Sequence, residues 1–270
     1  MLQGPVARCE DVPEAFDDVA ERYDLMVGLS PGYHRQLRSS AHALARAVPS
    51  PPAHVLDLGC GSGASTAALV QALTVHHGPE PTTVVLGVDG SEGMLASARK
   101  KRWPATVSFA QGRAEALGEH PELEAARAAG GLDGVLAAYL VRNVPDRDAA
   151  LGAIHDELRP GGALVVHEYS VRGRIIPTLL WTLVCWGVII PLGWLTSRNT
   201  SLYRYLWRSV LHMDSTAELE QRLRRAGFER VTTHPVPGWQ RGTVHTVVGH
   251  KPHAATPTDA ATDATSGSMP

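Results

Sequence analysis

The chain has 270 residues, of which 44% are hydrophobic, and a formal net charge of −2. This length and composition suffice for one folded domain with a sizeable core and flanking additions. The near-neutral charge and the absence of a basic run argue against a nucleic-acid partner, which would require clustered Lys and Arg side chains.

The first residues and the cysteines predict a cytoplasmic protein. Met1–Pro13 has neither the basic start nor the apolar core of a secretory signal peptide. Cys9, Cys60 and Cys185 have neither paired spacing nor the spacing of metal ligands. Reduced thiols and no metal site are therefore expected.

Two segments near the N-terminus have the apolar spacing of helices. In Glu14–Val27, apolar side chains recur three and four residues apart, at Phe16, Val19, Tyr23 and Met26. Ser30–Val48 contains a Pro-Gly turn and a second amphipathic stretch, with His34 close to the turn. His34 is either a packing or capping residue or a catalytic base.

A strand followed by alternate glycines is the clearest motif. Val55–Leu58 is predicted to be a buried strand, and a helical pattern begins after Gly59, Gly61 and Gly63. Glycine is needed where the backbone takes φ > 0 and where no Cβ can separate it from a ligand. The helix start offers unpaired N–H groups to that ligand. The motif predicts a nucleotide-like cofactor; the alternative is a tight turn with a structural role only.

Two acidic residues indicate which cofactor fits. Asp57 precedes the first glycine, and Asp89 ends the next predicted strand, Thr83–Asp89. A carboxylate before the glycines would repel a pyrophosphate but suits a cationic ligand. S-adenosylmethionine carries an ammonium, a sulfonium and one ribose. Asp57 is therefore expected near its amino-acid end, and Asp89 on its ribose hydroxyls.

The alternation of helices and strands continues beyond Asp89. Ser91 can cap a helix that runs through Arg102. A short strand is expected over Ala105–Ala110, and an exposed inserted helix over Glu119–Gly130.

The central strand, Leu132–Ala138, delivers Tyr139–Asn143 to its C-terminal end, where ligands bind in open parallel sheets. A helix over Asp148–Leu158 and a strand over Ala163–His167 follow. The residues expected to bind the cofactor at this edge are Asp57, Gly59, Gly61, Ser62, Gly63, Asp89, Gly90, Met94, Arg113, Ala114 and Ala138.

The segment Ile175–Leu195 has 21 residues without a charge. By length it can span a membrane. However, Pro177 and Pro191 interrupt it, and the strands expected over Gly227–His234 and Thr243–His250 must join the earlier sheet. We therefore expect a helix in the membrane interface or along a tunnel for a lipid tail. The alternative is a cap helix buried against the domain.

Several stretches resemble a known enzyme family. Leu56–Gly63 resembles the first motif of class I S-adenosylmethionine-dependent methyltransferases. The chain also resembles the ubiquinone/menaquinone biosynthesis C-methyltransferases, over residues 15–26, 32–35, 141–146, 158–164, 168–170 and 201–209. The resemblance implies an α/β, doubly wound fold with a seven-stranded, mostly parallel sheet. It also implies an N-terminal helical lid (1–50) and a methyltransferase domain (51–251) with an apolar insertion (175–212). Residues 252–270 are too poor in apolar side chains to bury a core, so a disordered tail is expected.

The resemblance also assigns roles in the site. It places Tyr23 of the lid near the transferred methyl group, and the side chains of Arg142 and Asn143 at the oxygen of a quinol. The family usually has Asp or Asn where this chain has Arg113. The adenine contact is therefore expected from the backbone or from Glu115.

The predicted function is C-methylation of a demethylmenaquinol-like polyprenyl quinol by Arg142, Asn143, Tyr23 and His34. The protein is expected in the cytoplasm, peripheral at the inner face of the cell membrane. The alternatives are a methyltransferase for a secondary metabolite or phospholipid, and an inactive cofactor-binding protein. For Arg142, the structural alternative is an ion pair with Asp146.

Overall fold

The computed structural model describes residues 32–49, 51–78, 83–197, 200–237 and 240–253. The predicted helix Glu14–Val27 with Tyr23, the residue Cys9 and residues 254–270 of the predicted tail lie outside these residues, whereas Pro252 and His253 of that tail are described. Their expected roles stay predictions.

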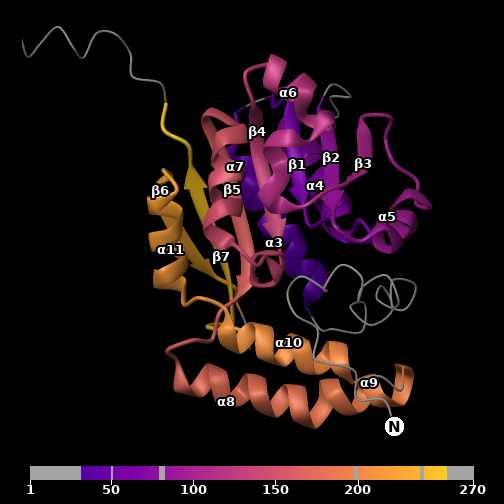
Figure 1. Cartoon of the computed structure of the whole chain (residues 1–270), viewed down its shortest axis with the longest axis vertical. Helices are drawn as coiled ribbons and strands as arrows, with labels where there is room; N and C mark the ends of the chain where they lie inside the picture. The colour runs from indigo at the N-terminus through magenta and orange to yellow at the C-terminus, as the bar shows by residue number, and fades with distance from the viewer. Residues whose placement is uncertain (1–31, 50, 79–82, 198–199, 238–239, 254–270) are drawn as a thin grey trace, which may run out of the picture.

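Seven strands form one mixed sheet (Figure 1). They are β1 (His54–Leu58), β2 (Val84–Asp89), β3 (Val107–Gln111), β4 (Leu132–Ala138), β5 (Leu158–Tyr169), β6 (Glu229–Pro235) and β7 (Val244–His250). Their order is β3-β2-β1-β4-β5-β7-β6; the first five are parallel, and β7 runs antiparallel to β5 and β6. All seven residues of β4 are buried, as expected for the central strand of a covered parallel sheet. The predicted α/β, doubly wound fold is confirmed.

Helices cover both faces of the sheet. On one face, α3 (Tyr33–Ala47) and α4 (Ala64–His77) bury Leu37, Leu44 and Leu69 against β1, β4 and β5. On the other face lie α7 (Arg147–Glu157), which packs on β5, and α11 (Thr216–Arg225), which packs on β6 and β7; their residues Leu151 and Leu223 are buried in one core. The two helical layers hold the sheet in place, and with it the C-terminal strand ends at which the predicted cofactor residues lie.

Several predicted elements differ in their bounds; the strand expected over Ala163–His167, for example, is the longer β5. The helix expected from Ser91 to Arg102 is α5 (Glu92–Arg99), with the Ser91 Oγ accepting from the Met94 N–H at 3.1 Å as a cap. The strand expected over Ala105–Ala110 is β3, shifted towards the C-terminus by one or two residues.

The expected exposed helix over Glu119–Gly130 is wrong. The chain forms two 3-10 turns, η2 (Ala114–Glu119) and η3 (Pro121–Leu123), and a short α6 (Glu124–Ala128). Leu123 and Ala126 are buried in the core. The insertion therefore packs on the domain, because Leu123 and Ala126 bury their apolar side chains in its hydrophobic core.

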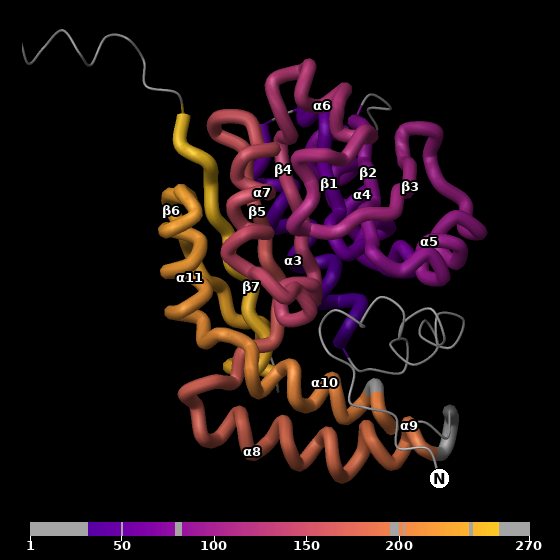
Figure 2. Tube along the Cα trace, viewed as in Figure 1, coloured from indigo at the N-terminus to yellow at the C-terminus, as the bar shows by residue number. Residues whose placement is uncertain are grey.

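The apolar segment forms a nearly continuous helix outside the sheet layers. It consists of α8 (Ile175–Val184), the π-helical turn η5 (Cys185–Ile189) and α9 (Ile190–Ser197), and it packs against α10 (Ser201–His212). In Figure 2 these helices lie side by side at one end of the molecule. We call α8, η5, α9 and α10 the apolar hairpin. Because β6 and β7 follow it and join the sheet that precedes it, the chain returns to the side from which it left.

Candidate functional site

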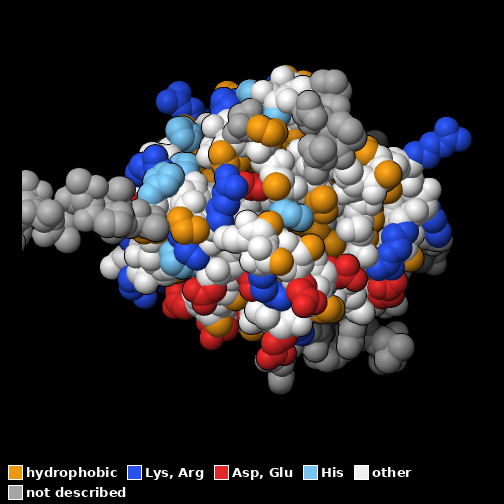
Figure 3. Space-filling model, turned by 90° about the horizontal axis from the view of Figure 1, so that it is seen from above, with side chains coloured by type: hydrophobic (Ala, Val, Ile, Leu, Met, Phe, Trp, Pro, Cys, Tyr) orange, Lys and Arg blue, Asp and Glu red, His pale blue; other side chains and the backbone are white. Residues whose placement is uncertain are grey.

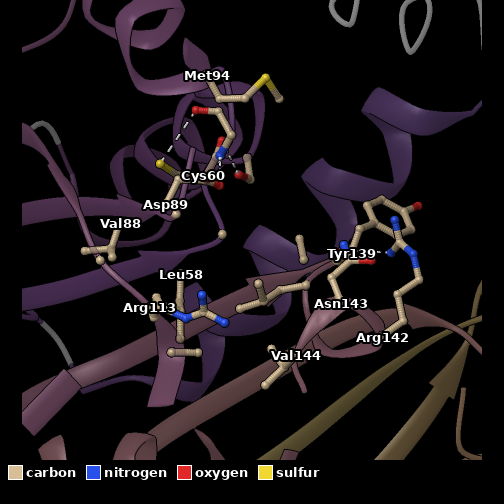
Figure 4. Close-up of a pocket in the computed structure, with 18 of the residues that line it drawn as sticks. Leu58, Cys60, Val88, Asp89, Met94, Arg113, Tyr139, Arg142, Asn143 and Val144 are labelled. Carbon is tan, nitrogen blue, oxygen red and sulfur yellow. Dashed lines mark hydrogen bonds between the residues drawn. The ribbon is translucent and has the colours of Figure 1, made fainter. Parts of the chain in front are cut away.

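A cleft lies at the C-terminal edge of the parallel strands, where β1, β2 and β4 end. The cavity has a volume of about 130 Å³ and is partly open to solvent. The predicted residues that line it are Gly59, Gly61, Ser62, Asp89, Gly90, Met94, Arg113, Ala114, Ala138, Arg142 and Asn143. Figure 4 shows Met94, Cys60 and Asp89 at one end of the cleft and Tyr139 and Arg142 at the other. The structure therefore joins the predicted cofactor turn and the predicted catalytic turn in one cavity.

The glycine turn has the backbone that its sequence predicts. Gly59, Gly61 and Gly63 have φ values of 75°, 54° and 91°, which L side chains rarely adopt. A Cβ on Gly59 would lie 2.9 Å from Leu140 Cδ1, and one on Gly61 would lie 3.2 Å from Met94 Cε. Because these positions exclude side chains, a ligand can lie directly on the backbone.

Asp89 is bound to the same turn. Its Oδ2 accepts from the Gly61 N–H at 2.8 Å, and its Oδ1 accepts from the Ser91 N–H at 2.9 Å. The carboxylate is thus held by both loops that border the cleft. A carboxylate has about four acceptor sites, so Asp89 can bind ligand hydroxyls as well as backbone groups.

Asp57 lies behind the turn and not among the residues that line the cleft. Its side chain is fully buried, and its Oδ2 accepts from the Ser65 and Thr66 hydroxyls at 2.8 and 2.6 Å. Burial raises the pKa of Asp57 to about 6, although these two bonds lower it. Among the described residues, its Oδ1 is buried without a hydrogen-bond partner. A cation in the cleft would favour the ionised carboxylate, so these residues fit a positively charged cofactor better than a phosphate.

Arg113 and Glu115 border the cleft beyond the end of β3. The Arg113 Nε lies 3.9 Å from the Glu115 Oε2, and the Arg113 side chain is half exposed. Arg113 therefore extends along the mouth of the cleft, with one carboxylate beside it. The predicted adenine contact by Glu115 stays a prediction.

Arg142 is buried at the other end of the cleft. It lies in the turn η4 (Val141–Asn143), and its Nη1 donates to the Glu168 Oε1 and to the Tyr139 carbonyl, both at 2.7 Å. Glu168 is itself buried, so the two charges neutralise each other in a dry environment. The alternative of an ion pair with Asp146 is wrong, because the Asp146 side chain caps α7 by accepting from the Ala149 N–H.

Asn143 connects the cleft with the apolar hairpin. Its Nδ2 donates to the Tyr139 carbonyl at 3.3 Å, and its Oδ1 accepts from the Tyr205 hydroxyl of α10 at 3.2 Å. A direct chain of contacts therefore runs from the catalytic turn to the hairpin.

Tyr139 holds this turn in a strained conformation. Its φ is 58°, which is unusual for a residue with a side chain. Its hydroxyl donates to the Gln36 Oε1 at 2.5 Å and lies 3.2 Å from the His167 Nε2. Burial lowers the pKa of His167 to about 3 and raises the pKa of Tyr139. These contacts hold the Tyr139 side chain between α3 and β5.

Other predicted residues lie elsewhere. His34 is exposed on the first turn of α3 and is not a lining residue, whereas its neighbour Tyr33 lines the cleft and stacks on Tyr139 with ring centroids 5.5 Å apart. Gly63 caps α4 and also lies outside the lining. The roles proposed for His34, Asp57 and Gly63 stay predictions. Tyr139 lies at the strand end where the sequence predicts ligand binding, but the contributions of Tyr33 and Glu168 to the site are not evident from the sequence.

Comparisons with known proteins agree with this geometry. The profile of the ubiE/COQ5 methyltransferase family matches residues 6–250. A protein from Methylobacterium nodulans named "Ubiquinone/menaquinone biosynthesis C-methyltransferase UbiE" is 31% identical over 227 residues, covering 82% of this chain and 84% of that protein. A protein of the same name from Shewanella sp. is 33% identical over 230 residues, covering 83% and 85%.

Solved structures share the fold at low sequence identity. Human N-acetylserotonin methyltransferase in complex with SAM has a TM-score of 0.58 and 14% identity, over 92% of this chain and 60% of that one. The [4+2]-cyclase SpnF has a TM-score of 0.61 and 16% identity, over 93% and 99%. These similarities concern the fold alone.

Proposed function

The chain belongs to the ubiE/COQ5 methyltransferase family, and from this premise we propose that it methylates a ring carbon of a demethylmenaquinol-like polyprenyl quinol. It is an S-adenosylmethionine-dependent methyltransferase. The observation that carries the proposal is the single cleft in which the glycine turn and Asp89 face Arg142 and Asn143.

The residues of the cleft have distinct tasks in this reaction. The bound cofactor supplies a methyl group activated by its sulfonium. A phenol ring carbon becomes nucleophilic when the hydroxyl loses its proton, because the oxygen then donates charge to the ortho carbon. Arg142 and Asn143 would stabilise that oxygen, and their hydrogen bonds to the Tyr139 carbonyl hold both side chains in position before the substrate arrives.

A row of aromatic side chains in mutual contact connects the hairpin with the cleft. Ring centroids lie 4.9 Å apart between Trp181 and Tyr169, 5.1 Å between Tyr169 and Tyr139, and 5.5 Å between Tyr139 and Tyr33. The Arg142 guanidinium lies 5.7 Å from the ring centroids of both Tyr139 and Tyr169. An aromatic row beside a cation suits a flat quinol ring attached to an apolar tail.

A transfer assay tests the acceptor. Purified protein with methyl-labelled S-adenosylmethionine should methylate reduced demethylmenaquinone in lipid vesicles, with one label on the ring by mass spectrometry. Menaquinone, which already carries that methyl group, is the matched control and should stay unlabelled. Label in phosphatidylethanolamine instead would overturn the quinol as acceptor, and cofactor binding without transfer to either lipid would favour the inactive alternative.

The apolar hairpin is proposed to dock on the membrane that holds this substrate. Ile175–Trp194 is long and apolar enough to cross a membrane, but only 17% of its apolar window is buried. Its exposed large apolar side chains are Ile175, Ile176, Leu179, Leu180, Leu183, Trp186, Val188, Leu192 and Trp194. Exposed arginines, among them Arg172 before the segment and Arg204 and Arg208 on α10, add positive charge beside this face. Such a combination favours the interface of an anionic bilayer.

Acidic substitutions on the hairpin should weaken membrane binding. Leu179→Glu and Leu183→Glu each replace a largely exposed leucine and should reduce co-sedimentation with phosphatidylglycerol vesicles by about tenfold, since each leucine contributes roughly 1.5–3 kcal/mol when buried in an apolar phase. Val75→Glu is the matched control, because Val75 is equally exposed but lies on α4. Equal loss in all three variants would contradict docking through the hairpin.

A further inference from the structure

A second, basic groove lies away from the cleft. It has a volume of about 690 Å³ and is formed by the C-terminal end of α3, the start of β5 and the face of β6 and β7 on the α3 side. Its ionisable lining residues are Arg46, Arg159, Arg230, His234, His250 and His253, and no carboxylate lines it among the described residues. Figure 3, seen from above, shows histidine, lysine and arginine side chains gathered on the left of the molecule, whereas acidic side chains lie mostly along the lower margin.

Two arginines of the groove have no neutralising partner within the described part of the chain. Arg159 donates to the buried Asp133 at 2.8 Å, so its charge is largely compensated. Arg46 and Arg230 form no ion pair with any residue that the structure describes. The whole chain has slightly more acidic than basic residues, with a net charge of −2, so its composition does not explain a groove lined by arginines without carboxylates. It indicates a preference for an anion.

The backbone at Arg230 is strained. Its φ is 50°, and it lies where the register of β6 against β7 shifts between Glu229 and Thr232. A bulge of this kind re-aims a side chain relative to a regular strand, and backbone strain in a residue other than glycine needs compensation from its surroundings. Here the result is that Arg230 lines the groove beside His250.

We propose that this groove binds a soluble polyphosphate anion of nucleotide size. Its volume is within the usual range for small-molecule sites, roughly 300–1,000 Å³. Guanidinium groups on separate elements match the oxygens of several phosphate groups better than those of one. A lipid headgroup is disfavoured, because the three arginines of the groove lie where α3 ends and where β5 and β6 start, at the end of the sheet opposite the apolar hairpin (Figure 1).

The pKa of His250 reflects the positive charge of the groove. Burial lowers this pKa most, the charges of Arg230 and His253 lower it further, and a hydrogen bond to the Ala47 backbone raises it. A bound phosphate group would offset these positive charges.

Calorimetric titration of the full chain with ATP and with inorganic tripolyphosphate at low salt tests the proposal. Both probes should bind with one site per chain, and the affinity should fall as salt is added. Arg46→Ala and Arg230→Ala should each weaken binding by about tenfold, the factor expected for a charge-assisted hydrogen bond. Arg225→Ala, which removes the same charge from the end of α11, should leave the affinity unchanged.

Four results would overturn the assignment. One is the absence of binding heat for both probes. Another is an equal loss of affinity in all three variants, which would indicate a response to net charge only. A third is displacement of tripolyphosphate by S-adenosylhomocysteine, which would place the anion in the cleft. Binding of phosphatidylglycerol vesicles that depends on Arg46 and Arg230 would instead assign the groove to a lipid headgroup and contradict the soluble ligand.

Discussion

Replacing Asp89 by alanine should abolish measurable binding of S-adenosylmethionine. The carboxylate accepts from the Gly61 and Ser91 N–H groups and so holds the two loops that border the cofactor end of the cleft. In the proposed pose it also accepts from the ribose hydroxyls. Losing two charge-assisted hydrogen bonds at about 1.5–3 kcal/mol each weakens binding by about 10²–10⁴-fold. Calorimetry with S-adenosylhomocysteine gives the change directly.

A nearby acidic residue provides the control for this experiment. Glu92 lies at the start of α5, its side chain is 54% exposed, and it pairs with Arg99 outside the cleft. Glu92→Ala removes the same charge close to the same loop and should bind the cofactor as the parent does. Thermal unfolding of Asp89→Ala separates loss of the fold from loss of the site. A folded Asp89→Ala variant that retains affinity within threefold would show that the ribose lies elsewhere.

The sequence predicts the cofactor end of the cleft because backbone geometry determines it. Alternate glycines after a buried strand require positive φ values, and Gly59, Gly61 and Gly63 have them. The strand that ends at Asp89 pairs with β1 in parallel register, so this carboxylate reaches the glycine turn. Both results follow from short-range patterns and from the rule that parallel strands place their C-terminal ends at one edge.

The acceptor end of the cleft could not be predicted in the same way. The partner of Arg142 is Glu168, which is 26 residues away along the chain, whereas Asp146 lies closer in sequence but caps a helix. The brace on Tyr139 comes from Gln36 and His167 on two further elements. Contacts of this kind depend on how helices and strands pack across the sheet, and no local periodicity contains that information.

Replacing Arg142 by alanine should slow methyl transfer and leave cofactor binding nearly unchanged. Arg142 lies at the opposite end of the cleft from Asp89 (Figure 4), and its expected task is to stabilise the charge that develops on the quinol oxygen. Removing one such donor reduces kcat by about 10²–10³-fold. Single-turnover assays with demethylmenaquinol in vesicles measure the loss, and calorimetry with S-adenosylhomocysteine checks the binding. Arg222→Ala, which breaks ion pairs to Asp148 and Asp214 away from the cleft, should transfer at the parental rate.

The ion pair with Glu168 allows the catalytic and structural effects of Arg142 to be separated. Arg142→Ala leaves the Glu168 carboxylate buried without its counter-charge, which costs about 3–5 kcal/mol of folding stability. Adding Glu168→Gln removes that charge, so the double variant should recover most of the lost stability in thermal or urea unfolding. Its rate should stay at the level of Arg142→Ala, because the double variant still lacks the guanidinium that would stabilise the quinol oxygen. If the double variant instead recovers the parental rate together with the stability, Arg142 supports the fold of the turn and the charge for the reaction comes from another residue.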